Sequence, residues 1–563
     1  MPRENQERHH YSEVLEQLKT CFPYPVSNPV MDGYFIHAMS RFLDKVDDLK
    51  SAVPILGLGD QRPYLNSQAS AFPEELSTVQ ELTGVLVDYC RGMPVWGHPN
   101  SQVNVVPTTS IPSIMAFMAG AIYNPNIIWD EYSARFAEAE IEAVAMVSDL
   151  VGYDPQQSGG VFTFSGTGTI FYGVKLALER LFGGRLMQQG LREEVKIVAS
   201  ASAHYAKLNA AGWLGVGMRN LVAIPATRDS EMSLPDLEDY LRQAFGAGEK
   251  VALIIATMGT TDAFGLDDLA GIVQLRDQLS QEYRLAAPPY IHADAVIGWI
   301  WAVFRDYDFD HNPLGFRGRT LRALRDSVLR LSSLGQADSL GVDFHKTGYA
   351  PYISSAFLVR DRRHLTLLCR EPDKMPYLYQ FGHYRPGIYT LECSRPGTGA
   401  LAALASMRLF GKKGYRVLIG HIVEMAQTLR ERLEAHPFID VLNDFNYGPV
   451  TLFRVYPQGV EARQAFAREL SDPAYREALE RHNHYNRRIF ELVRERAMRG
   501  EGVLLSWTNA YRHADYDGEP GPPIAALKSF ILSPWTDVAA VDLAARQVVE
   551  AREQLAAEEG SEQ

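Results

Sequence analysis

Short apolar runs alternate with helical stretches between residues 160 and 360, and this alternation strongly limits the possible folds. Strands that alternate with helices form a largely parallel sheet, because each helix carries the chain back to the edge where the next strand starts. We therefore predict an α/β domain with a mostly parallel seven-stranded sheet. The predicted strands are 161–164, 195–199, 221–224, 251–257, 290–293, 338–344 and 356–359, and the predicted helices lie near 169–183, 205–213, 234–245 and 267–283.

The flanking regions have different patterns. Residues 1–110 mix polar helices with Gly- and Pro-rich loops, and we expect them to pack on a partner subunit. The α/β pattern defines a large domain over 111–400. Mixed helices and strands over 401–563 predict a small α+β domain. At its start we expect one helix ending near residue 409 and a second over 415–435, because Gly411 and Gly414 interrupt the pattern.

Composition limits the compartment and the partners. The 563 residues carry a net charge of −13 without long basic runs, which disfavours a nucleic-acid partner. We find neither an apolar stretch long enough to span a membrane nor a signal-peptide core. The cysteines have no metal-ligand spacing and are too few for a disulfide framework, so we predict a cytoplasmic protein without a metal site. They are Cys21, Cys90, Cys369 and Cys393.

A histidine and a lysine follow the predicted strand at 338–344. Alternating apolar residues lead to His345-Lys346, and Thr347-Gly348 follows. A lysine amine whose pKa is lowered by burial or charge can form a Schiff base with an aldehyde. Taken alone, Lys346 is equally consistent with a surface lysine.

Small residues follow the first predicted strand and open a helix. Ser165, Gly166 and Thr167 lie where backbone N–H groups and hydroxyls can bind a phosphate. The same residues also make an ordinary helix cap.

Three further strand ends carry polar residues. His204 opens a helix and can lie flat on an aromatic ring, although a solvated histidine fits as well. Thr260, in Gly-Thr-Thr, can direct a hydroxyl at a ligand or simply form a turn. Asp294 ends a central strand, where a carboxylate needs a partner such as a protonated pyridine nitrogen. It could equally be exposed to solvent.

Together these segments supply a phosphate-binding turn, a stacking imidazole, a carboxylate for a pyridinium ring and a Schiff-base lysine. Those are the requirements of pyridoxal 5′-phosphate. Their joint occurrence in one order is much more specific than any single segment.

The chain also resembles the group II pyridoxal-phosphate-dependent amino acid decarboxylases over residues 90–540. The motifs are HPNS at 98–101, GVFT and SGT within 160–167, SAHY at 202–205, GTT at 259–261, HADA at 292–295, ADS and DFHK within 337–346, and SRPG at 394–397. WGHPNS, HKTGYAPY and the insertion at 305–335 make the layout most similar to bacterial tyrosine decarboxylases. The resemblance implies the aspartate aminotransferase-like fold (PLP fold type I) and a homodimer.

The resemblance also implies a role for each matching residue. Lys346 would link to the cofactor, Asp294 would pair with its ring nitrogen and His204 would stack on the ring. The phosphate would contact Ser165, Gly166, Thr167 and His345, while Thr260 and Ala295 would line the cofactor. His98 would lie near the substrate carboxylate. A tyrosine of 371–390 would donate a proton, and of Tyr377, Tyr379, Tyr384 and Tyr389 we favour Tyr379.

Two segments depart from the family pattern. Gly168-Thr169-Ile170 stands where Glu-Ala-Asn is usual, and Trp299 brings bulk where a Gly-Gly pair is usual. The expected reaction is decarboxylation of an L-amino acid, aromatic first and acidic second. The alternatives are aldehyde synthesis, retro-aldol cleavage, or a catalytically silent subunit.

Overall fold

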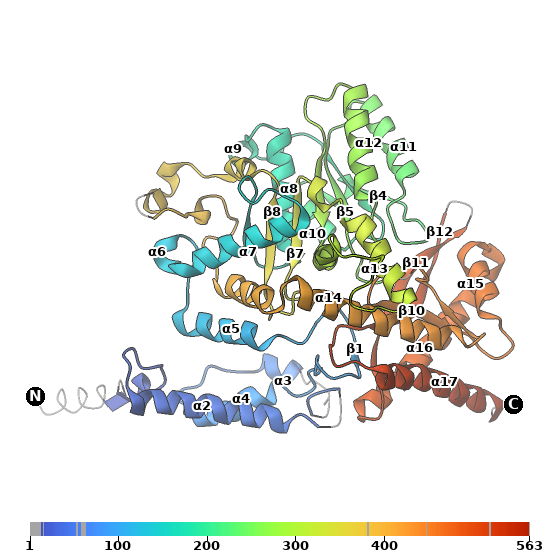
Figure 1. Cartoon of the computed structure of the whole chain (residues 1–563), viewed down its shortest axis with the longest axis horizontal. Coiled ribbons are helices and arrows are strands. Elements are labelled where there is room, and N and C mark those ends of the chain that lie inside the picture. The colour runs from blue at the N-terminus through green and yellow to red at the C-terminus, as the bar shows by residue number, and fades with distance from the viewer. Residues whose placement is uncertain are drawn as a thin grey trace, which may run out of the picture.

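The computed structural model describes residues 13–14, 16–51, 54–57, 64–379, 382–445, 447–516 and 519–561. A seven-stranded sheet occupies the centre of the molecule (Figure 1). Its order is β2-β8-β7-β6-β5-β3-β4, and the neighbours from β7 to β4 are parallel, whereas β8 is antiparallel to both β2 and β7. The predicted mostly parallel sheet is confirmed. The strands are β2 (Gly159–Thr163), β3 (Lys196–Ser200), β4 (Leu221–Ile224), β5 (Val251–Thr257), β6 (Tyr290–Asp294), β7 (Ser339–Asp343) and β8 (Ser355–Val359).

Helices cover both faces of this sheet, which explains the continuous apolar runs. Strand β5 is buried along its whole length. Its Leu253 and Ile255 belong to the core shared with helix α8, whereas Ile254 and Ala256 belong to the core on the opposite face. The helices of this region are α5 (Ile111–Tyr123), α6 (Asp130–Ser133), α7 (Arg135–Val151), α8 (Gly166–Leu181), α9 (Leu186–Gln189), α10 (Ala206–Trp213), α11 (Leu234–Gly246), α12 (Leu269–Glu282) and α13 (Gly318–Leu331).

A long helix, α14 (Thr398–Glu434), connects the large sheet to the C-terminal part. We predicted two helices here, and the structure confirms the break, because two helical segments meet at a kink at Gly411. The chain stays helical through Gly414, and only Gly411 leaves helical geometry, with a φ of 53° that suits glycine. The division of the chain at residues 110 and 400 stays a prediction, since α14 starts just before the second boundary.

The C-terminal region contains a second sheet of order β1-β11-β12-β10-β9. Strands β11 and β12 form a long hairpin. The sequence pattern does not predict β11, because the polar and exposed residues of that strand weaken the alternation of apolar residues. Strand β1 comes from the N-terminal part and pairs in parallel with β11. The elements are β1 (Ser101–Gln102), β9 (Ile439–Val441), β10 (Val450–Val455), β11 (Leu504–Tyr516), β12 (Glu519–Phe530), α15 (Ala462–Ser471), α16 (Arg476–Met498) and α17 (Val538–Ser561).

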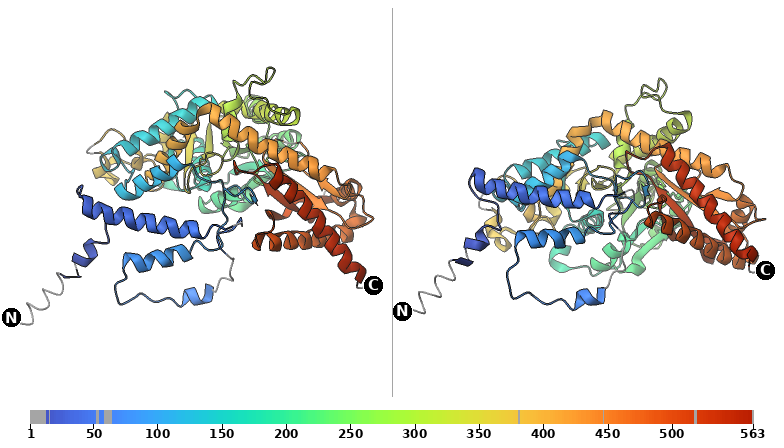
Figure 2. Two further views of the ribbon diagram at one scale, coloured as in Figure 1. Left: turned by 60° about the horizontal axis from the view of Figure 1, so that its bottom comes forward. Right: turned by 90° about the horizontal axis from the view of Figure 1, so that it is seen from below.

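The N-terminal helices lie along one side of the molecule, away from the large sheet (Figure 2). They are α2 (Pro29–Asp48), α3 (Tyr64–Gln68) and α4 (Val79–Asp88). Helix α2 has no buried residue, although Val30 and Ile36 are among its apolar side chains and Val30 is 79% exposed. Among the described helices, none is long and apolar enough to cross a membrane.

Candidate cofactor and substrate site

The predicted polar residues meet at the carboxyl-terminal edge of the parallel strands. His204 follows β3, Thr260 follows β5, Asp294 ends β6 and Lys346 follows β7. Parallel strands place all their carboxyl ends on one edge, where ligands commonly bind in open α/β sheets. His204, Thr260, Asp294 and Lys346 accordingly line one cavity of about 150 Å³.

Lys346 lies in the turn between β7 and β8, and its side chain is 18% exposed. Its Nζ is 2.9 Å from Oδ2 of Asp343. Burial alone would lower the pKa of Lys346, but Asp343 and Asp294 outweigh it and hold the pKa above the ordinary value. In the cofactor-free protein the amine is therefore a paired ammonium group.

Asp294 is almost completely buried at the end of β6. Burial raises its pKa to about 6, and the opposing charge of Lys346 lowers it by less. Among the described residues, no hydrogen-bond partner reaches its Oδ1. A buried carboxylate oxygen without a partner is costly, so this atom fits the protonated nitrogen of a bound pyridine ring.

The N-terminus of α8 forms another wall of the cavity. Ser165 caps the helix by accepting the N–H of Gly168, and Gly166 and Thr167 follow it on the cavity wall. His345 also lines the cavity, and burial lowers the pKa of its imidazole. Backbone N–H groups of a helix start, together with hydroxyls, provide donors for a phosphate.

Local packing in α8 explains why Gly168-Thr169-Ile170 stands where Glu-Ala-Asn is usual in the family. A Cβ at Gly168 would lie 2.3 Å from Oγ1 of Thr163, so a side chain such as Glu does not fit there without movement. Thr169 is fully buried beside Gly341, where a Cβ would lie 2.2 Å from its Oγ1. Ile170 lines the cavity with its apolar side chain.

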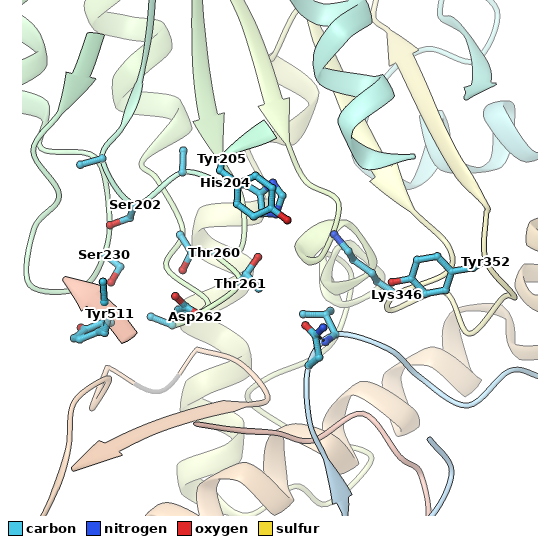
Figure 3. A pocket seen from close by; sticks show the side chains of 16 residues that line it. Ser202, His204, Tyr205, Ser230, Thr260, Thr261, Asp262, Lys346, Tyr352 and Tyr511 are labelled. Carbon is cyan, nitrogen blue, oxygen red and sulfur yellow. Dashed lines mark hydrogen bonds between the residues drawn. The ribbon is translucent and has the colours of Figure 1, made fainter. Parts of the chain in front are cut away.

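A larger pocket of about 590 Å³ shares His204, Thr260 and Lys346 with the first cavity. Figure 3 shows Lys346 and His204 facing each other across this pocket. The His204 ring lies 4.0 Å from that of Tyr205, and burial followed by the charge of Lys346 lowers the pKa of His204. A neutral imidazole at this place can stack on a flat ring.

Trp299 does not occupy either pocket wall. It is fully buried in the 3-10 helix η2 (Gly298–Phe304), where its Nε1 donates to the carbonyl oxygen of Asp343 and its ring packs edge-on against Phe344. The Trp299 side chain therefore packs against the end of β7 and does not fill either pocket.

Other predicted residues lie apart from the cavity in this single chain. Ala295 is fully buried but is not one of the described lining residues, and neither is His98, whose Nδ1 accepts the N–H of Asn100. The side chains of Tyr377 and Tyr379 lie outside the described part of the chain. Tyr384 donates to Glu140 instead of facing Lys346. Tyr389 lines a separate small pocket with Tyr172.

Sequence reasoning gave no role to Asp343, Tyr352, Asp262 and Tyr511, although all four line the two pockets. Asp343 is inside the DFHK motif and precedes Lys346 by three residues, which could have drawn attention to it. Tyr511 comes from β11 of the second sheet, and the sequence gives no signal that it reaches this site.

Comparison with known proteins identifies the family to which this domain belongs. Residues 59–305 match the family model described as the pyridoxal-dependent decarboxylase conserved domain. The chain carries a pyridoxal-dependent decarboxylase domain. The match contains Ser165, His204 and Asp294, and it ends before Lys346.

Two similar proteins agree with this identification, and one solved structure shows the same fold. The decarboxylase is 24% identical to an L-2,4-diaminobutyrate decarboxylase of Acinetobacter baumannii over 64% of this chain and 68% of the relative. It is 27% identical to an L-tyrosine decarboxylase of Enterococcus faecium over 42% of this chain and 41% of the relative. The structure of Oryza sativa TDC with PLP and tryptamine superposes with a TM-score of 0.71 at 18% identity, covering 94% of this chain and 99% of the other.

The resemblance to group II decarboxylases and the predicted fold are thereby confirmed. The protein is a pyridoxal-phosphate-dependent amino acid decarboxylase. The cavity fits that cofactor, because it combines a lysine amine, an unpartnered buried carboxylate oxygen and a helix N-terminus.

Proposed function

We propose that the decarboxylase acts on an aromatic L-amino acid, with tyrosine as the first candidate and an acidic amino acid as the second. The observation that carries this choice is the large pocket beside Lys346. Its wall includes the rings of Tyr205, Tyr352 and Tyr511, which offer flat apolar surface for an aromatic side chain. Hydroxyl groups on the same wall can bind a phenol.

The charge of the pocket separates the two candidates. Asp262 is an acidic residue of the wall, and it pairs with Lys528 at 2.8 Å. The paired carboxylate leaves little positive charge for a substrate carboxylate in the side-chain pocket, which disfavours an acidic amino acid. One relative is a tyrosine decarboxylase, which supports the aromatic candidate.

The roles of the site residues form part of this proposal. Bound pyridoxal phosphate supplies an aldehyde that reacts with amines and a ring that accepts electrons. Lys346 would hold the aldehyde carbon, Asp294 would keep the ring nitrogen protonated and His204 would fix the ring plane. Ser165, Gly166, Thr167 and His345 would bind the phosphate, and Thr260 would border the ring, whereas Ala295 is not among the described residues that line the cavity.

Two proposed roles depend on segments outside the cavity of this single chain. His98 would contact the substrate carboxylate, and Tyr379 would deliver a proton to the substrate carbon that loses carbon dioxide. Water exclusion by the surrounding wall would protect that carbon. Tyr379→Phe should lower amine formation, and aldehyde release in this variant would support the role of the tyrosine proton.

The test is a screen of the protein amino acids, and of common non-protein ones, for amine and carbon dioxide release by the purified holoenzyme. We expect one amine per carbon dioxide and no ammonia with tyrosine or another aromatic amino acid. Ammonia with an aldehyde would favour an aldehyde synthase, and activity confined to glutamate or aspartate would contradict the aromatic proposal. A protein that binds the cofactor but turns over nothing would favour the silent subunit.

We also propose a homodimer in the cytoplasm. Helices α2, α4 and α5 present apolar side chains to solvent, including Ile36, Leu86 and Ile111, the last 74% exposed. Exposed apolar patches of this kind mark interaction surfaces. Sedimentation should give twice the mass of the chain, and Ile36→Asp with Leu86→Asp should shift it toward the monomer. All four cysteines are free thiols, which supports a reducing compartment.

A further inference from the structure

Asp343 is a second buried carboxylate in the cofactor cavity, and none of the roles above uses it. It ends β7 and its side chain is 1% exposed. Ser355 donates to Oδ1 at 2.6 Å, and Lys346 lies 2.9 Å from Oδ2. The carboxylate is thus held in one orientation from two sides.

This carboxylate lies against the start of α8. A Cβ at Gly166 would be 2.7 Å from Oδ2 and 3.2 Å from Oδ1 of Asp343, so the two residues are in close contact. Gly166 is the first residue of α8 and lines the same cavity. The positive end of the helix dipole favours one anion there, and Asp343 already supplies it.

The surrounding charges keep Asp343 ionised while the cofactor is absent. Burial alone would raise its pKa, but Lys346 and His345, with the Ser355 hydroxyl, hold the pKa below the ordinary value. The charge of Asp343 also raises the pKa values of three other groups in the cavity region. They are Asp294 from β6, His204 after β3 and Tyr352 from the β7–β8 turn.

A phosphate dianion at the start of α8 would stand beside this buried carboxylate. Two like charges at such a distance repel strongly, and the usual result is that one of them takes up a proton. Forming the link to the cofactor also removes the Lys346 ammonium group, which is the main partner of Asp343.

We propose that Asp343 competes with the cofactor's phosphate for the N-terminus of α8 and accepts a proton from solvent when the phosphate binds. The proton adds to a carboxylate oxygen, and the resulting O–H donates to a phosphate oxygen. The neutral carboxyl then no longer stabilises the ammonium form of Lys346, so the amine loses its proton more readily and can react. Asp343 is a positioning residue that couples phosphate binding to the reactivity of Lys346.

Calorimetry with the cofactor-free protein tests this proposal without any turnover. The probe is pyridoxine 5′-phosphate, which lacks the aldehyde and cannot link to Lys346. Between about pH 7.5 and about pH 9 its phosphate stays dianionic, since the second phosphate pKa is about 6. The wild-type affinity should fall as pH rises, and titrations in two buffers of different ionisation enthalpy should reveal proton uptake.

Asp343→Asn supplies a neutral group of the same shape. We expect it to bind the probe roughly tenfold more tightly than wild type near pH 8.5, with less proton uptake and a flatter pH profile, because a like charge has been removed. Ser355→Ala removes a hydrogen bond that stabilises the ionised carboxylate, so it should change the affinity in the same direction by less.

Asp294→Asn is the matched control, because it removes the other buried carboxylate of the cavity without touching the start of α8. With inorganic phosphate as probe, which has no ring, Asp343→Asn should tighten binding and Asp294→Asn should leave it nearly unchanged. Equal affinities and equal proton uptake in wild type and Asp343→Asn would overturn the inference about Asp343. Failure of all variants to bind pyridoxine 5′-phosphate would instead contradict the cofactor site itself.

Discussion

Arg395 binds both carboxylate oxygens of Glu140, with Nη1 2.6 Å from Oε1 and Nη2 3.1 Å from Oε2. The pair is buried and joins α7 to the SRPG segment before α14. Glu140 also accepts the N–H of Phe162 in β2 and the hydroxyl of Tyr384. The Glu140 carboxylate therefore connects the end of the 371–390 segment to the sheet beside the turn at 165–167.

Arg395→Met should destabilise the protein by about 3–5 kcal/mol, because it leaves the buried Glu140 charge without its main partner. Urea unfolding of the cofactor-free protein measures this loss. Arg408→Met is the control, since Arg408 lies on α14 and pairs with Glu142 at the surface. Its effect should stay within about 0.5 kcal/mol, and equal losses in the two variants would contradict the role of burial.

Lys346→Ala should abolish turnover and the visible absorbance of the covalently linked cofactor, because Lys346 is the only lysine among the described residues that line the cavity. Absorbance spectroscopy with added pyridoxal phosphate gives the first readout and amine release the second. Lys412→Ala, which removes an exposed lysine of α14 paired with Asp306, should keep both signals. Turnover that survived the loss of Lys346 would be incompatible with the assigned site.

Asp294→Asn should weaken binding of pyridoxine 5′-phosphate by more than about tenfold, because a hydrogen bond to a charged group contributes about 1.5–3 kcal/mol. Fluorescence or calorimetric titration measures the change. In the wild type, the contribution of Asp294 should also decline as pH falls through about 6, where its carboxylate becomes protonated. Asp310→Asn, at an exposed carboxylate paired with Arg325, should leave the affinity unchanged.

The buried Lys207 should make the free energy of unfolding depend on pH. The side chain is buried and donates to the carbonyl of Ser200 at 2.5 Å, just before the turn that carries His204. Burial lowers the pKa of Lys207 to about 8, so between about pH 8 and about pH 10.4 the folded protein binds fewer protons than the unfolded chain. The unfolding free energy should therefore rise with pH across this interval.

Lys207→Met removes the titrating group while keeping the length of the side chain. The difference in unfolding free energy between wild type and this variant should grow by about 3 kcal/mol from pH 8 to above pH 10, because the pKa of Lys207 falls from about 10.4 in the unfolded chain to about 8 in the folded protein. Chemical denaturation at several pH values measures it. A constant difference across the interval would show that Lys207 does not titrate in the folded state.

Much of the fold could be read from the sequence. Helices cover both sides of the sheet, so a central strand such as β5 has apolar residues on both faces. Such a strand is recognised in the sequence as a continuous apolar run. Strand β11 has exposed or half-buried residues at most positions, so its alternation of apolar and polar residues is too weak to predict a strand. The break at Gly411 and the helical state of Gly414 look alike in sequence, since a glycine permits a bend without requiring one.

The sequence by itself determined which chemical groups stand at the ends of the strands, because strand order and side-chain type are local properties of the chain. It placed His204, Asp294 and Lys346 at one edge of the sheet through the rule that parallel strands share their carboxyl ends. The tertiary structure decided which groups touch. The contact of Asp343 with Gly166 joins residues 177 positions apart, and packing of α8 on β7 sets it. Charge competition at the phosphate site arises from that packing, because electrostatic energy depends on distance in space.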